Sequence, residues 1–402
     1  MILSVNSIRT SNLTEYAWKR LRYFLVETLT CSRIKEIHGL KDDKHRENIR
    51  KQAEQIAFCI RQSAEYFQAA SNATLATKPL LLYYGSVSLG TALFLLKKDG
   101  EYALDKLQAN KSHQHHGLEH KGFAAINPKV APLEILETIC ATPFRNSKDE
   151  AWGHFALFYS ALCPPAVAID RKITSDQAQG SLDGLQPQYC VDLPPIDAFK
   201  DRIFSAKELV ATLPDLVEDL RLLGVDSKLR WCKINYNIHL EHAVGADGSN
   251  PKHVKTHEDF KIVINGISPD QQKAYLGFLN SVSCPLTAKQ VFSNHLLLTG
   301  KRTFNEGDDP RGFFLPDAVD DLHGRIFAIL ESQHYIAEVA AFHVLLFQFG
   351  MLARYYPEKW MSLIGHNMHF SEFLNALLTA AEKKLPLLFL DQMTDTKTIN
   401  QA

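Results

Sequence analysis

The chain has 402 residues, of which 46% are hydrophobic and 22% charged, an ordinary globular composition that can fill a sizeable core. Its 44 Lys and Arg residues nearly balance 45 Asp and Glu residues, so the net charge of −1 excludes bulk electrostatic binding to nucleic acid or to an anionic membrane, though not a local basic patch. A chain this close to neutrality is poorly protected against self-association, and we expect an oligomer or a protein partner.

The apolar runs and the cysteines predict a cytoplasmic protein. Residues 1–20 contain no apolar stretch long enough for a signal peptide. The longest apolar runs, at residues 79–96 and 340–352, are interrupted by polar residues and fall short of the ~20 mostly apolar residues of a membrane span. The seven cysteines form no CxxC pair, which indicates buried, reduced thiols.

Residues 1–163 are predicted to form an N-terminal helical region. Residues 46–70 carry apolar side chains at spacings of three and four, which places them on one face of a helix. Residues 77–98 are apolar on nearly every face, as expected of a central helix packed on several sides. The polar residues 108–122 predict a loop. Two shorter helices are expected at residues 132–140 and 150–162.

Residues 164–227 are predicted to form a linker or excursion that ends in a helix. Residues 164–200 are rich in Pro, Gly, Asp and Gln, which marks the best candidate for a domain boundary, and residues 205–223 predict the helix. Residues 228–316 then predict a small α/β insert. Its strand-like runs are residues 230–241, 257–267 and 290–304, with a short helix at 268–278.

Residues 317–402 return to a helical pattern and are expected to pack on the N-terminal helical region in one core. Residues 322–356 hold a long helical pattern, residues 371–384 a last amphipathic helix, and residues 385–390 a short apolar tail. The predicted fold class is therefore mainly α with a smaller α/β insert, or α+β overall.

Two segments resemble the YaaC-like family of bacterial proteins. They are KPLLLYYGSVSLGTALFLL, followed after a polar loop by HHGL, and the C-terminal FHVLLFQFGMLARYYPEKW. With the strand-rich stretch between them, the similarity covers most of the chain. The first segment also resembles, more loosely, the HEPN superfamily of helical bundles, whose helix begins with a Tyr-Tyr pair before a His-Gly loop. This resemblance implies a HEPN-like helical core that binds nucleotide or RNA.

Many HEPN domains are metal-independent ribonucleases that carry an Arg, four to six further residues, and then a His. The nearest match is Arg145 and His154, with eight residues between them, and a nine-residue offset places them on opposite faces of one helix. These two residues are therefore weak catalytic candidates. The resemblance implies a non-catalytic or conditionally active protein in a bacterial stress or phage-defence assembly. Two alternatives stay open: an RNA-cleaving toxin with an atypical Arg/His pair, and a structural or adaptor subunit.

The candidate ligand-binding residues are Arg354, Tyr355, His115, His116 and Tyr84. Arg354 ends an apolar helix, where it either satisfies carbonyls or pairs with Glu358, or binds a phosphate or carboxylate of a ligand. Tyr355 beside it belongs either to the core or to a base-stacking surface.

Whether these candidate residues lie close together depends on the direction in which the two apolar helices pack against each other. If the polar ends of the two helices lie at the same pole of the core, Arg354 lies beside the loop of residues 113–118. If the polar ends lie at opposite poles, each is an ordinary helix end. A buried Tyr hydroxyl needs a partner, which the His-Gly loop can supply to Tyr84 or to Tyr83.

No cofactor and no metal is predicted, and no DNA-specific motif or membrane partner. The first histidine group, interrupted by Gly117, lacks an HExxH pattern and is expected in a surface loop; it comprises His113, His115, His116 and His120. The second group is expected as exposed loop histidines, although three of them would meet if they faced one another across a hairpin; it comprises His239, His242, His253 and His257.

Overall fold

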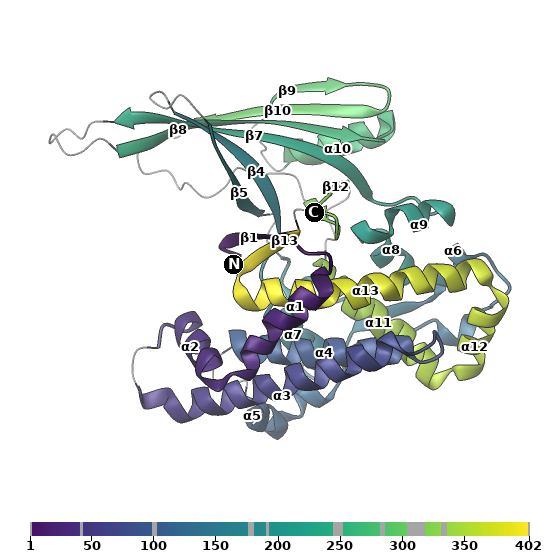
Figure 1. Ribbon diagram of the computed structural model, residues 1–402. Helices are drawn as coiled ribbons and strands as arrows, with labels where there is room; N and C mark the ends of the chain where they lie inside the picture. Colours follow the sequence, from purple (N-terminus) through teal and green to yellow (C-terminus); the bar gives the residue numbers. More distant parts are fainter. Residues whose placement is uncertain are drawn as a thin grey trace.

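The computed structural model combines a helical body with a long twisted sheet, and the mixed α+β class is confirmed (Figure 1). The structure describes residues 2–40, 43–98, 103–175, 181–189, 193–243, 252–281, 286–303, 318–330 and 336–400. The sheet lies on one side of the helical body, and both ends of the chain lie where the two meet.

The helical body buries one large hydrophobic core. Its longer helices are α1 (Leu13–Leu21), α2 (Glu27–Ile37), α3 (Arg46–Ser71), α4 (Lys78–Lys97), α11 (Glu338–Tyr355), α12 (Pro357–His366) and α13 (Met368–Thr394). Its shorter helices are α5 (Leu104–Asn110), α6 (Pro132–Thr138), α7 (His154–Tyr159), α8 (Ala206–Val210) and α9 (Val217–Leu222). Helix α4 packs against α3, α11 and α13, because it has apolar residues on every side.

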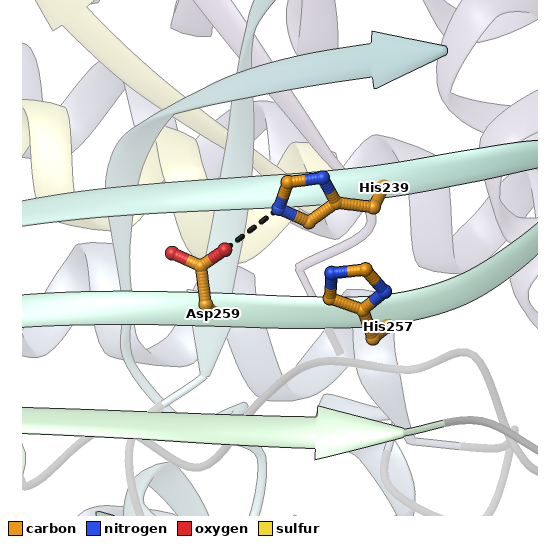
Figure 2. Close-up of side chains that lie close together, drawn as sticks. All are labelled: His239, His257 and Asp259. Atoms are coloured by element: carbon orange, nitrogen blue, oxygen red, sulfur yellow. Dashed lines mark hydrogen bonds and ion pairs between the residues drawn. The ribbon is translucent and has the colours of Figure 1, made fainter. Parts of the chain in front are cut away.

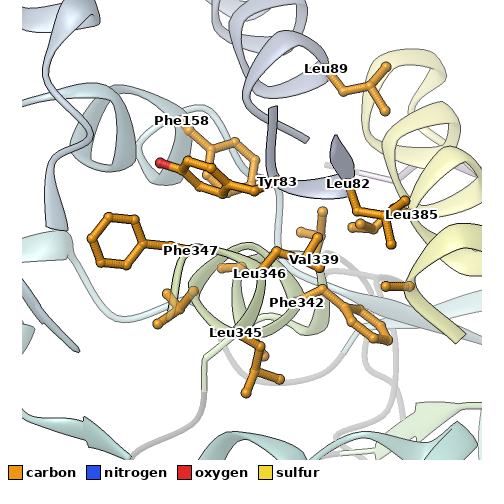
Figure 3. Close-up of a cluster of buried hydrophobic side chains, with 14 of the residues drawn as sticks. Leu82, Tyr83, Leu89, Phe158, Val339, Phe342, Leu345, Leu346, Phe347 and Leu385 are labelled. Carbon is orange, nitrogen blue, oxygen red and sulfur yellow. The ribbon is translucent and has the colours of Figure 1, made fainter. Parts of the chain in front are cut away.

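Helices α4 and α11 pack against each other in the middle of this core (Figure 3), and they run antiparallel, since Gly350 lies against Leu80 and His343 against Ser86. Tyr83 of α4 packs edge-on against Phe347 of α11, with ring centroids 5.7 Å apart. Helix α4 is long and apolar enough to cross a membrane, but 72% of its most apolar window is buried inside the protein. Its apolar surface is therefore already covered by the chain's own helices.

The sheet forms a second core with one helix, α10 (Pro269–Ser281). The strand order is β11-β12-β7-β8-β10-β9, and β4 joins β7 in parallel and pairs with β5. Its strands are β4 (Ala166–Ser175), β5 (Ser181–Tyr189), β7 (Leu229–Ala243), β8 (Lys252–Asn265), β9 (Leu286–Val291), β10 (His295–Thr303), β11 (Ala318–Asp320) and β12 (Ile326–Ile329). Tyr275 and Leu279 of α10 pack on the apolar face of the sheet.

Two smaller sheets tie the body together. Strand β1 (Ser4–Ile8) pairs in parallel with β13 (Thr396–Asn400), so the first and last described strands are neighbours. Strands β2 (Leu118–Lys121), β3 (Cys140–Pro143) and β6 (Phe204–Ser205) form the other sheet.

The sheet extends beyond the limits of the predicted insert at both ends. Strands β4 and β5 lie in the segment expected to be a linker, and β11 and β12 lie in the segment expected to be helical. Both additions pair, directly or through a neighbour, with one edge of β7. The predicted strand over residues 290–304 is part of an antiparallel pair, β9 and β10, that reverses direction after Val291.

Three helix predictions differ from the structure. The helix expected over residues 205–223 is broken into α8 and α9 around Pro214, which has no N–H to continue a helix. The pattern over residues 322–356 becomes strand β12 and then helix α11, because β12 completes the edge of the sheet. The last helix and the apolar tail are one helix, α13, which contains Pro386.

A buried group of charged residues joins the helical body to the strands. We call it the Lys384 cluster; its members are Asp215, Asp320, Glu338, Lys384, Asp391 and Lys397. Lys384 Nζ lies 2.6 Å from both Asp215 Oδ2 and Glu338 Oε1. Lys397 Nζ lies 2.7 Å from Asp320 Oδ1. Burial raises the pKa of the carboxyls of Glu338 and Asp391 to about 7.

Candidate functional site

Arg354 and Tyr84 meet at one pole of the helical core. Arg354 lies in the last turn of α11, and its guanidinium donates a hydrogen bond to the hydroxyl of Tyr84 near the start of α4. The same guanidinium carbon lies 5.1 Å from the ring centroid of Tyr355. Among the described residues Arg354 has no carboxylate partner, so the pairing with Glu358 considered above does not occur.

His116 lies next to this pair and is held by Tyr83. The Tyr83 hydroxyl lies 2.9 Å from His116 Nδ1. Burial raises the pKa of the Tyr83 phenol, so the hydroxyl stays protonated and the two groups share one hydrogen bond. Burial first, and then the neighbouring His115 and Arg354, lower the pKa of His116, so the ring is neutral at pH 7.

These side chains form the candidate site, which we call the Arg354 cluster; its members are Tyr66, Tyr83, Tyr84, His116, Arg354 and Tyr355. Tyr66 comes from α3 and stacks on Tyr84 with ring centroids 5.9 Å apart at 29°. Helices α4 and α11 thus place their polar ends at one pole, with the His-Gly loop between them. Whether the cluster binds a ligand stays a prediction.

The loop that carries His116 is fixed by two glycines in close backbone contact. Gly117 has φ +76° and Gly153 has φ +104°, a region that L side chains rarely adopt. A Cβ on Gly153 would lie 2.5 Å from Gly117 Cα, so neither position accepts a side chain without displacement. The first backbone N–H groups of α7, of His154 and Phe155, donate to the carbonyls of His115 and His116. The loop is therefore anchored to the start of a helix.

The other histidines of this loop point to different partners. The His115 ring packs on Phe144 with ring centroids 4.1 Å apart, and its Nδ1 accepts the N–H of Gly117. His120 stacks on Phe123, with centroids 4.4 Å apart. His115 therefore stabilises the conformation of the loop, whereas His116 lies beside Arg354. In the part of the chain that the structure describes, the histidines from 113 to 120 form no group that could hold a metal ion.

Arg145 and His154 do not face one another. The Arg145 guanidinium binds Asp149 and Asp197, with Nε 2.8 Å from Asp149 Oδ1. The His154 ring is buried against α4, where its Nε2 lies 3.0 Å from the carbonyl oxygen of Val87. Burial lowers the pKa of His154 to about 4, so it is a neutral core residue. The expected shared helix is also absent, since α7 begins only at His154.

A model of one protein family matches the chain over residues 23–138 and 169–393, and it is described as YaaC-like Protein. The chain belongs to the YaaC-like family. No curated protein and no solved structure matches this YaaC-like chain. The family match spans α4, the His-Gly loop and α11, and so includes every member of the Arg354 cluster.

Sequence reasoning about this YaaC-like protein missed Tyr66 and the pairing of His343 with Ser86. Tyr66 lies beside the buried Phe67, at the edge of the apolar stripe of α3, so its position in the stripe was the available signal. Ser86 Oγ lies 2.9 Å from His343 Nδ1, and both residues lie in predominantly apolar segments. Isolated polar residues in such segments indicate a buried partner on another helix.

Proposed function

We propose that this YaaC-like protein binds a phosphate-bearing ligand, a nucleotide or RNA, at the Arg354 cluster, without cleaving it. The observation that carries the proposal is an exposed guanidinium positioned by a tyrosine hydroxyl instead of by a carboxylate. A guanidinium has five N–H donors and carries its charge at any physiological pH. One donor is used by Tyr84, which orients the group without neutralising it.

The neighbouring rings supply the second element of recognition. Tyr355 is 54% exposed, and a nucleobase that stacks on its ring would bring the phosphate of the nucleotide toward the neighbouring guanidinium of Arg354. The neutral ring of His116 adds a polar group beside Arg354. Negative charge placed here would raise the pKa of His116, because an anion favours the imidazolium form, so binding is expected to strengthen as the pH falls toward 6.

The same proposal includes a likeness of the helical core to a known superfamily. We infer that the helical core is HEPN-like, from the Tyr-Tyr start of α4 and the His-Gly loop that it contacts through Tyr83 and His116. Residence in the cytoplasm, self-association or a protein partner, and a place in a bacterial stress or phage-defence assembly follow from the sequence and from this resemblance.

Ligand binding by Arg354 variants tests the proposal. Fluorescence anisotropy with short labelled RNAs and calorimetry with nucleotides would compare the wild type with Arg354→Ala and Arg354→Lys. We expect Arg354→Ala to weaken binding by at least tenfold and to flatten its salt dependence, because one phosphate contact is lost. Arg354→Lys keeps the charge but loses the planar fork, and we expect an intermediate affinity.

Arg221→Ala is the matched control, because Arg221 is 79% exposed, pairs with Glu218 and lies on α9 outside the Arg354 cluster. Its affinity should equal that of the wild type. Equal affinities of Arg354→Ala and the wild type would overturn the proposal, and binding by neither protein would favour the adaptor alternative. RNA cleavage that persists in Arg145→Ala but not in Arg354→Ala would make the cluster a catalytic site instead.

A further inference from the structure

Two long strands of the sheet bring two histidines and an aspartate together on one face. His239 of β7 and His257 of β8 are directly opposite one another, and Asp259 lies two residues further along β8 (Figure 2). Directly opposed residues of an antiparallel pair point to the same face, as do residues two apart on one strand. These histidines were expected in exposed loops, with a meeting across a hairpin as the alternative; the register places His239 and His257 on neighbouring strands.

The three side chains lie within the reach of one ion. One nitrogen of each imidazole and one carboxylate oxygen all lie within 4.8 Å of one another. His239 Nε2 lies 2.7 Å from Asp259 Oδ2, and the two imidazole rings are stacked with centroids 4.1 Å apart at 13°. Zinc bonds to nitrogen and oxygen of about 2.0–2.2 Å require ligand atoms roughly 3–3.5 Å apart in a tetrahedron. Binding an ion therefore requires His239 Nε2 and Asp259 Oδ2 to separate slightly and the two stacked rings to turn toward a common point.

The supporting structure favours metal binding over a simple ion pair. Asn237 Nδ2 donates to Asp259 Oδ1 at 2.8 Å, which turns the other oxygen of the carboxylate toward His239. A second-layer hydrogen bond of this kind orients carboxylate ligands in metal sites. The strands are held by pairing on both sides, β7 by β4 and β8 by β10, and α10 packs on the opposite face of the sheet. The ligands are thus carried by rigid elements.

We propose that His239, His257 and Asp259 bind one divalent transition-metal ion. Two imidazoles and one carboxylate suit zinc, cobalt, nickel or ferrous iron better than calcium or magnesium, which prefer ligand sets made of oxygen. Three protein ligands leave at least one coordination position for water or a ligand. The side chains of His239 and Asp259 are 33% and 39% exposed, so solvent reaches that position. The proposal is independent of the Arg354 cluster.

Cobalt titration of the metal-free protein tests this inference, because Co²⁺ in a site of low coordination number gives visible absorption bands that report its ligands. We expect one ion per chain, with calorimetry giving the same stoichiometry for Zn²⁺. His239→Ala, His257→Ala and Asp259→Asn should each weaken binding by at least tenfold, and Asn237→Ala by less.

Two further variants sharpen the test. His369→Ala removes an exposed histidine of α13 and should leave the stoichiometry and affinity unchanged. Lys301→Ala should strengthen binding several-fold, because Lys301 is exposed and directly opposite Asp259 on β10, where its charge repels a cation. Circular dichroism would verify that each variant is folded. Absence of stoichiometric binding, or binding that survives all three ligand substitutions, would overturn the proposal.

Discussion

Ser86 Oγ lies 2.9 Å from His343 Nδ1, and the pair joins α4 to α11 in the middle of the helical core. Both side chains are fully buried, and burial together with the nearby His154 and His116 lowers the pKa of His343, so its ring is neutral. A buried polar contact of this kind helps to fix how two largely apolar helices are aligned along their axes, because a shift by one turn would leave two buried polar groups unpaired.

Ser86→Ala is therefore expected to destabilise the protein. The substitution leaves His343 Nδ1 buried without its partner, which costs about 1–3 kcal/mol. Urea denaturation would measure the loss in the free energy of unfolding. Ser71→Ala is the matched control, since Ser71 is exposed at the end of α3 and bonds only the local Gln68 carbonyl; it should change stability by less than about 0.5 kcal/mol. Equal effects of the two substitutions would contradict this account of the core.

Gly117→Ala is expected to displace the loop that carries His116. Gly117 has φ +76°, and a Cβ there would lie 2.7 Å from the backbone nitrogen of Phe155. Gly224→Ala is a control of similar φ, +70°, with nothing within 4 Å of the new Cβ. The control should lose about 1 kcal/mol from backbone strain alone, and Gly117→Ala clearly more. Calorimetric melting compares the two, and similar losses would show that the close contact with α7 is unimportant.

Buried neutral histidines predict a loss of stability in mild acid. The pKa of His154 is lowered to about 4 in the fold, from 6.5 in an exposed ring, because of its burial. Between these two pKa values the unfolded chain binds a proton at His154 and the folded chain does not. The stability of the folded state that is present above pH 6.5 is therefore lost as the pH falls toward 4. His154 alone should cost about 2 kcal/mol between pH 7 and pH 5. Chemical denaturation of His154→Gln should show a pH dependence smaller by that amount; an unchanged dependence would contradict it.

Lys384→Met is expected to be strongly destabilising. It removes the cation between the buried carboxylates of Asp215 and Glu338, and breaking a buried ion pair from one side costs about 3–5 kcal/mol. Lys51→Met removes the lysine of an exposed pair with Asp105 and should cost less than about 1 kcal/mol. Denaturation midpoints in urea would compare them. If both variants unfold at the same urea concentration, the Lys384 cluster does not stabilise the junction between the helical body and the strands.

The helices predicted most accurately are those whose residue pattern is regular along their whole length. Helix α3 was expected at residues 46–70 and spans Arg46–Ser71, because its apolar stripe is regular over its whole length. Helix α4 was predicted with similar limits, since an apolar segment with Pro near its start and Lys at its end has few other conformations. These patterns are local and need no knowledge of the rest of the fold.

Elements that depend on distant pairing could not be predicted. Residues 326–329 lie in an apparent helical pattern, yet they form strand β12, because the edge of β7 offers them hydrogen bonds. His239 and His257 meet only through a register that includes a bulge beside His239, and no local signal encodes that register. Spacing alone likewise left open whether Arg354 lies at the pole of Tyr84, since both senses of helix packing bury the same apolar surface.

The parallel pairing of β1 with β13 sets the order in which the protein can be completed. Ser4 is the partner of Thr396 and Ile8 the partner of Asn400, so the second residue of each pair is synthesised 392 residues after the first. Until then β1 has no partner and its backbone groups stay available to other strands.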